Sequence, residues 1–228
     1  MPQAVDRAIA LLRAFTDSDP ELSLTSLAAR TGLPISTTHR LARTLLDHGL
    51  LEQNRDRYRI GVGLVALATP AQQRLGVHGL IRHLHSLASD IEITASFGVP
   101  VDDELIILAS APPRQRFCPR QMPGQWQPLA QTAMGLVVLA FTRETAATAE
   151  LVQVRHRGYA DAPALRHDDV RAIAVPVLGP DGEPLGALGI QARRHRLSDD
   201  RVRQILPVMR HHARLIPSPV IPQNKTSP

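Results

Sequence analysis

Apolar residues recur at helical spacing through the first fifty residues and define three amphipathic segments. The first covers residues 4–16, which we expect to form a helix that packs across the next two. The second begins near Thr25, whose hydroxyl is expected to accept a backbone N–H, and stops at Gly32. The third begins at Pro34, a residue type tolerated in a first helical turn, and runs to Gly49. The pattern therefore predicts two helices joined by a tight turn, preceded by a third.

The segment after Pro34 divides into an apolar stripe and a polar face. The stripe consists of positions three and four apart, which are Thr38, Leu41, Ala42, Leu45 and Leu46. The opposite face carries hydroxyl groups, cations and one carboxylate, which are Ser36, Thr37, His39, Arg40, Arg43 and Asp47. The sequence thus predicts a helix with one face in the core and one cationic, hydrogen-bonding face.

A short basic hairpin follows this helix. Residues 50–51 begin a strand, residues 54–57 form a turn, and residues 58–60 return on the second strand. Three arginines lie at or beside its tip: Arg55, Arg57 and Arg59. Three helices followed by such a hairpin form a winged helix-turn-helix, in which the second motif helix enters the major groove of DNA. We therefore expect a DNA-binding domain over residues 1–61.

Beyond residue 61 the pattern first stays helical and then changes. Residues 62–75 and 76–89 keep helical spacing, with a kink or break expected at Pro70 because proline costs about 3 kcal/mol in a helix interior. Strands are expected over residues 91–99, 104–109, 172–178 and 185–190, and helices over residues 129–141 and 199–215. This mixture predicts an α/β domain with a mainly antiparallel sheet.

Composition and charge refine this picture. The chain has 228 residues, which suits two modest domains. Its formal charge of +5 favours a polyanionic partner, although many basic proteins bind nothing charged. Residues 23–60 hold six arginines and three carboxylates, a net charge of only +3, so we expect one copy to bind DNA weakly and a dimer to bind a two-part site. Residues 217–228 include four prolines and are expected to form a disordered tail.

An ordered set of motifs carries a family resemblance. Gly-Leu-Pro-x-Ser-Thr-x-x-Arg-Leu, followed by Gly-Leu-Leu and Tyr-Arg-x-Gly, resembles the N-terminal half of IclR-type bacterial transcriptional regulators. GQWQPLAQTAMGLVVLA, RHRGYADAP and IAVPVLGPDGEPLGALGI are similar to the effector domain of that family. The resemblance implies an α+β protein: an all-α winged helix-turn-helix over residues 1–61, a linker helix over residues 62–75, and a GAF-like effector-binding and oligomerisation domain over residues 76–216.

The expected function is a sequence-specific regulator that binds a double-stranded DNA operator as a homodimer or homotetramer. Side chains on the polar helix face should read or clamp the groove, Arg30 should contact phosphate, and the wing should touch the backbone. The full set of expected DNA contacts is Arg30, Ser36, Thr37, Thr38, Arg40, Arg43, Arg55 and Arg57. The sequence does not distinguish a repressor from an activator.

The resemblance also implies a small organic effector, a carboxylate or an aromatic metabolite, that modulates operator binding. The implied contacts are Ala133, Met134, Gly135, Ala162, Val170, Ala172, Gly189 and Gln191. Leu136, Leu165 and Asp169 replace the lysine, acidic residue and glycine that the family often has. The pocket is thus expected to have few polar groups, so either the effector is rather apolar or the domain binds no ligand and serves for dimerisation.

An enzyme is the remote alternative. Cys118 has no neighbouring glycine-rich turn or helix start that would activate its thiol. His83 with His85 and His211 with His212 have spacings that point the paired rings apart on a helix, which argues against a metal site. A single cysteine excludes an internal disulfide, and no apolar run reaches the roughly 20 residues of a membrane span. We therefore expect a cytoplasmic protein that is not an enzyme, needs no cofactor and does not bind membranes.

Overall fold

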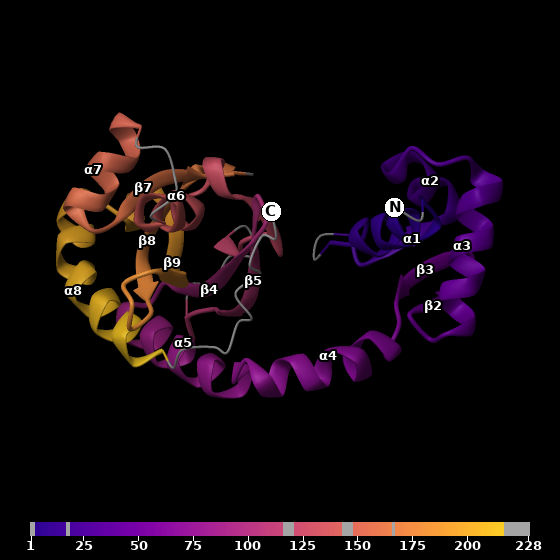
Figure 1. Cartoon of the computed structure of the whole chain (residues 1–228), viewed down its shortest axis with the longest axis horizontal. Helices are drawn as coiled ribbons and strands as arrows, with labels where there is room; N and C mark the ends of the chain where they lie inside the picture. Colours follow the sequence, from indigo (N-terminus) through magenta and orange to yellow (C-terminus); the bar gives the residue numbers. More distant parts are fainter. Residues whose placement is uncertain (1–2, 17–18, 116–120, 143–147, 166, 217–228) are drawn as a thin grey trace. The chain divides into compact units, whose positions relative to one another are not determined.

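The computed structural model describes residues 3–16, 19–115, 121–142, 148–165 and 167–216 (Figure 1). The expected tail over residues 217–228 and the thiol of Cys118 lie outside these ranges. The contacts of the chain group it into two compact units, residues 1–72 and 73–228. Each unit has a hydrophobic core of its own and is described by itself.

The first unit is the expected winged helix-turn-helix. Its elements are α1 (Gln3–Arg13), β1 (Glu21–Ser23), α2 (Leu24–Thr31), α3 (Ile35–Asp47), β2 (Leu51–Asn54) and β3 (Arg57–Ile60). The core joins all three helices to the hairpin through buried Leu11, Leu27, Ala42, Leu45 and Tyr58. The sequence pattern missed β1, a strand of three residues that pairs antiparallel with β3 and makes the wing a three-stranded sheet.

Local hydrogen bonds set the start and end of the helix pair. Ser23, not the expected Thr25, caps α2, because its Oγ accepts the backbone N–H of Ser26 at 3.1 Å. Gly32 ends α2 at φ +66°, a conformation that glycine adopts without strain. Pro34 precedes α3 and offers no side-chain cap to its first amide groups.

Helix α4 (Gly63–Arg74) begins directly after the wing and is joined to the end of α3. The backbone N–H of Gly63 donates to the carbonyl of Gly49 at 2.9 Å, and a Cβ on Gly61 would lie 2.2 Å from the same oxygen. Of the kink or break expected at Pro70, the break is wrong, because α4 continues through this residue. Ala66, whose carbonyl loses its helical donor, is exposed, so water can bond to it.

The second unit is a six-stranded antiparallel sheet with the strand order β6-β5-β4-β9-β8-β7. Its strands are β4 (Thr94–Val101), β5 (Glu104–Ala111), β6 (Trp126–Pro128), β7 (Ala160–Ala164), β8 (His167–Leu178) and β9 (Pro184–Arg193). Its helices are α5 (Val77–Ile91), α6 (Ala133–Phe141), α7 (Ala149–Arg157) and α8 (Asp199–Leu215), with short 3-10 turns at Leu129–Gln131 and Arg194–Arg196. The mainly antiparallel sheet is confirmed, whereas β6, β7 and α7 were not predicted.

Helices cover both faces of this sheet (Figure 1). Phe97 on β4 and Leu188 on β9 belong to the core under α5 and α8. Ala187 on β9 and Ala174 on β8 belong to a second core under α6 and α7. Because successive strand residues point to opposite faces, the polar residue Ser96 beside Phe97 lies on the α6 face.

Arg171 on β8 connects β7 to the start of α8. Its guanidinium donates to Asp161 at 3.0 Å, to Asp199 at 2.8 Å and to the carbonyl of Leu197 at 2.6 Å. The hydrogen bond to Asp161 raises the pKa of Arg171 above its usual range, although burial opposes it. This cluster fixes the edge of the sheet next to α8.

Candidate functional site

The polar face of α3 is exposed as the sequence predicted. Ser36, His39, Arg40 and Arg43 are exposed and Thr37 is half-buried. These side chains come from successive turns of one helix, so they form a continuous surface about two turns long. This surface has the length and the polar character that insertion into a major groove requires.

Thr38 does not belong to this surface. The structure places its side chain at 0% exposure, and its Oγ1 donates to the carbonyl of Pro34 at 3.1 Å. Thr38 lies in the same helical stripe as buried Ala42 and Leu45, which is the physical reason for its burial. Its place among the expected DNA contacts was therefore wrong.

Three of the expected arginines are unpaired. Within the described part of the chain, Arg40 and Arg43 on α3 and Arg55 at the wing tip form no hydrogen bond or ion pair through their guanidinium groups. Arginine offers five N–H donors and stays charged at any physiological pH. These side chains are therefore available for phosphates or base edges.

Two other expected arginines are engaged within the unit. Arg30 donates to Asp19 at 2.8 Å and to the carbonyl of Ala14 at 3.0 Å. Arg57 donates to the carbonyl of Glu21 at 3.2 Å. The bonds of Arg30 connect α2 to the segment after α1, so this side chain has a structural role that the sequence did not reveal.

Arg55 has an unusual backbone conformation. Its φ is +56°, a value that glycine adopts freely but other residues seldom do. The Gln53 side chain supports this turn by donating to the carbonyl of Arg55 at 2.9 Å. Glycine would be the unstrained choice at this position, so an arginine here favours a role for its side chain.

Glu52 joins the wing to the linker helix. One carboxylate oxygen accepts two hydrogen bonds from Arg59, at 2.7 Å and 2.9 Å, and the other accepts the backbone N–H of Val62 at 3.3 Å. Arg59, and then Val62, lower the pKa of Glu52 below its usual value. Arg59 is therefore paired with Glu52, although its position beside the wing tip had suggested that it could contact DNA.

We expect Glu52→Gln to lower slightly the melting temperature of the DNA-binding unit at pH 7. A carboxylate whose pKa is lowered in the folded state stabilises above its unfolded pKa of about 4.3, and this effect disappears as the pH falls through the folded pKa. Thermal unfolding followed by circular dichroism from pH 7 to pH 3 should show the two proteins converging in acid. Asp56→Asn, the same charge change in the same hairpin, is the control, and a difference that persists at pH 3 would contradict the assignment.

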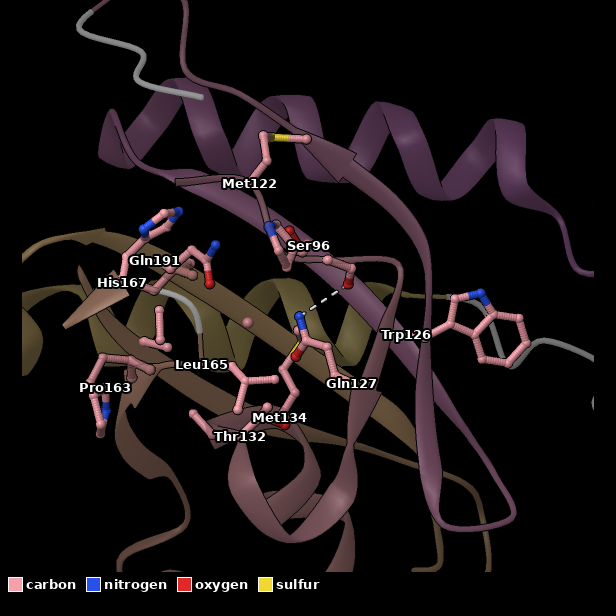
Figure 2. A pocket seen from close by; sticks show the side chains of 18 residues that line it. Ser96, Met122, Trp126, Gln127, Thr132, Met134, Pro163, Leu165, His167 and Gln191 are labelled. Atoms are coloured by element: carbon pink, nitrogen blue, oxygen red, sulfur yellow. Dashed lines mark hydrogen bonds between the residues drawn. The ribbon is translucent and has the colours of Figure 1, made fainter. Parts of the chain in front are cut away.

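A hollow opens on the α6 face of the sheet in the second unit (Figure 2). Its cavity volume is only about 40 Å³, and the wider empty space of about 620 Å³ includes open solvent at its mouth. Five of the eight expected effector contacts line it, and they are Ala133, Met134, Ala172, Gly189 and Gln191. The start of α6 and the middle of β8 and β9 thus meet here, as the resemblance implied.

The three remaining expected contacts lie elsewhere. The amide of Gly135 donates to Thr132 Oγ1 at 3.2 Å instead of facing the hollow, and a Cβ on Gly135 would lie 2.0 Å from the carbonyl oxygen of Leu129. Val170 is completely buried, and Ala162 packs against the core under α6. Gly135 therefore serves close packing of the backbone, and its assignment as a ligand-binding amide was wrong.

Met134 occupies part of the hollow. A Cβ on Gly189 would lie 2.7 Å from both Cγ and Sδ of Met134, so the methionine lies directly on this glycine. Met134 is 6% exposed. Because methionine is unbranched and has several rotatable bonds, it can move aside for a ligand or fill the space without one.

The walls of the hollow are more polar than expected. Ser96, Gln127, Thr132 and His167 line it besides Gln191, whose Nε2 donates to the carbonyl of Gln121 at 2.8 Å. Ser96 Oγ shares a hydrogen bond of 2.8 Å with Ser110, and Gln127 Nε2 donates to Gly124 at 3.2 Å. Ser96, a polar residue two positions after Thr94 in a mainly apolar strand, was a sequence signal for this wall.

The charges of the residues that line the hollow limit the kinds of ligand that can bind there. The described lining residues include no lysine or arginine, and His167 is the one basic side chain among them. Figure 2 shows Trp126 directed away from the hollow, which fits its 37% exposure. A ligand here would bind through amide and hydroxyl groups and apolar contacts more than through charge.

Other classes of site are not supported by the described residues. Among them, no group of three or more histidine, cysteine, aspartate or glutamate side chains is arranged to hold a metal ion. In the same ranges, no helix combines the length and the apolar character that crossing a membrane would require.

The sequence matches two family models. Residues 4–55 match the IclR helix-turn-helix domain, and residues 141–218 match the model described as bacterial transcriptional regulator IclR C-terminal. The HTH-type transcriptional regulator XynR of Escherichia coli strain K12 is 26% identical over 223 residues, which cover 86% of this chain and 88% of that protein.

Two solved structures share the fold. An IclR transcriptional regulator from Alicyclobacillus acidocaldarius has a TM-score of 0.77 and 23% identity, and the match covers 95% of this chain and 98% of that one. An IclR homologue from Microbacterium hydrocarbonoxydans, complexed with 4-hydroxybenzoate, has a TM-score of 0.71 and 19% identity, and the match covers 94% of this chain and 98% of that one.

Proposed function

Because this chain belongs to the IclR family of bacterial transcriptional regulators, we propose that it controls transcription by reading an operator with α3 and the wing. The observation that carries the proposal is the exposed face of α3, on which Arg40 and Arg43 are unpaired. Two exposed like charges one turn apart on a helix repel each other by a few tenths of a kcal/mol, and a bound polyanion would offset this repulsion.

The residues divide into groove contacts and backbone contacts. Ser36, Thr37 and Arg40 on the first two turns of α3 read base edges, and Arg43 contacts a phosphate or a base one turn further. Arg55 reaches the DNA from the wing tip, assisted by Arg57. We assign Arg30 to the support of α2 instead of to phosphate, because its guanidinium is already paired with Asp19.

The protein acts as a dimer or a dimer of dimers. Helix α4 has no buried residue, and Val62, Val65 and Leu67 on it or just before it are 74%, 63% and 66% exposed. A helix of twelve residues without a packed face is marginal in water, so another surface must cover it. We assign this surface to α4 of a second copy of the chain, because a dimer also has two DNA-binding units and twice the number of phosphate contacts.

A small organic compound in the hollow modulates operator binding. The amide groups of Gln127 and Gln191 and the apolar side chains around Met134 suit a ring-bearing compound, and His167 suits a weak acid. The related structure with 4-hydroxybenzoate supports this ligand class. The contact of Met134 with Gly189 favours the second candidate, a domain that binds no ligand and serves for dimerisation.

The proposal is tested by selecting fragments of the source genome that bind the full-length protein and footprinting them. We expect one inverted repeat whose halves lie about 10 base pairs, or a multiple of that, apart. We expect 4-hydroxybenzoate or a related aromatic acid, at up to millimolar concentration, to shift operator affinity severalfold. If no fragment is selected, the proposal is refuted. If the footprint is normal but no compound changes operator affinity, the second candidate, a domain that binds no ligand, is supported.

We further propose that the second unit is not catalytic and that the protein acts in the cytoplasm, where the operator lies. The XynR relative is a transcriptional regulator, which supports the first part.

A further inference from the structure

One apolar side chain lies on the surface assigned to DNA. Ile35, the first residue of α3, is 56% exposed, and the residues that follow it on the exposed face are polar or charged. Single exposed apolar residues are common on proteins and need no explanation by themselves. Ile35 is of interest because it lies at the N-terminal end of α3, which is the end that meets the base edges in a helix-turn-helix.

The neighbours of Ile35 define what it can touch. Positions three or four apart share a helix face, so Ile35 lies at the edge of the polar face. On one side of it Thr38 and Ala42 are buried, and on the other side His39 and, one turn further, unpaired Arg43 are exposed. Arg40 lies on the adjacent row. Because Arg43 and Arg40 hold this face against the DNA, the side chain of Ile35 is placed over the floor of the major groove.

The chemistry of the groove leaves one apolar target. Base edges in the major groove present acceptors and donors, and the only methyl group among them is the C5-methyl of thymine. Isoleucine is branched at Cβ and has one strongly preferred χ1 rotamer in a helix, so it presents its methyl groups in a fixed place. A stiff apolar group at this position suits recognition of another methyl group.

We propose that Ile35 is a specificity-determining residue that recognises the methyl group of one thymine in each half of the operator. This inference rests on the proposed function, because it requires α3 to enter the major groove. It concerns one base pair, whereas operator binding as a whole depends on the arginines and the polar side chains of α3.

The test removes the methyl group from the DNA and the side chain from the protein, separately and together. In the selected operator, thymines in symmetric positions of the two halves are replaced by deoxyuridine, one pair at a time. Affinity is measured for the wild type and for Ile35→Ala. We expect one pair whose replacement weakens the wild type about threefold to tenfold, the scale of one or two lost methyl contacts.

For Ile35→Ala we expect the same replacement to have no effect, since the partner of the methyl group is gone. Ile35→Val, which keeps two methyl groups on a branched Cβ, should remain sensitive to deoxyuridine. Val152→Ala, at a position on α7 that is 54% exposed, is the control for loss of an exposed apolar side chain and should match the wild type.

Two results would overturn the inference while leaving the proposed function intact. One is a wild type that is indifferent to deoxyuridine at every position. The other is an Ile35→Ala variant with the same deoxyuridine sensitivity as the wild type. If no operator fragment is selected in the first place, the proposed function fails and the inference fails with it.

Discussion

Replacing Arg40 by alanine is expected to weaken operator binding by about 1–3 kcal/mol, the value of one good contact between arginine and a base. The side chain is exposed and unpaired in the protein alone, so its removal leaves no buried group without a partner. The whole cost should therefore appear in DNA affinity and not in folding. Equilibrium binding at fixed salt, together with thermal unfolding of the variant, checks both parts.

The pattern of the loss distinguishes the role of Arg40. If it reads a base, the variant should lose the preference for that base pair; if it contacts phosphate, affinity should fall equally on all sequences and the salt dependence should decrease by about one ion. Arg82→Ala on α5 removes an exposed positive charge from the second unit and is the control. Unchanged operator affinity in Arg40→Ala would remove this residue from the interface.

Gly135→Ala is expected to destabilise the second unit by about 1–3 kcal/mol or more, because the new Cβ would lie 2.0 Å from the carbonyl oxygen and 2.4 Å from the Cα of Leu129. Backbone atoms cannot move aside without displacing the start of α6 or the turn before it. Urea unfolding followed by tryptophan fluorescence measures this directly, since Trp126 is the only tryptophan of the chain and lies in the second unit.

Gly189→Ala is the matched control and has a different expected result. Its Cβ would come closest to the side chain of Met134 and not to a backbone atom, and this side chain can change rotamer, so we expect a smaller loss of stability than for Gly135→Ala. The added methyl group reduces the hollow, so effector-induced changes in DNA binding should diminish. If Gly135→Ala were as stable as Gly189→Ala, the packing role of Gly135 would be refuted.

The DNA-binding unit was predictable because its signals are local. The apolar stripe of α3 and the glycine that ends α2 follow from residues a few positions apart, and both occur where expected. Strands of three residues such as β1 and β6 carry no period long enough to detect. Their formation depends on a neighbouring strand that supplies the hydrogen bonds.

The candidate ligand site was predictable only in part. The resemblance placed the start of α6 and strands β8 and β9 around one ligand, and in the structure Met134 and Gln191 line the same hollow. It assigned the backbone N–H of Gly135 to the ligand, whereas in the structure this N–H donates to Thr132 Oγ1. It also missed Ser96, because this residue is distant in sequence from α6, β8 and β9 and reaches the hollow only through the pairing of β4 with β9.

The sequence by itself determined that the chain has a helix with one cationic face, a basic hairpin and a mainly antiparallel α/β domain, because hydrophobic period, turn residues and motifs act over short distances. The tertiary structure alone decided which charges are free and which are engaged. Arg40 and Arg43 are unpaired, whereas Arg30 and Arg59 are bonded to Asp19 and Glu52. The reason is that a hydrogen bond between residues distant in sequence depends on where both residues lie in space. The residues of either segment alone do not determine these positions.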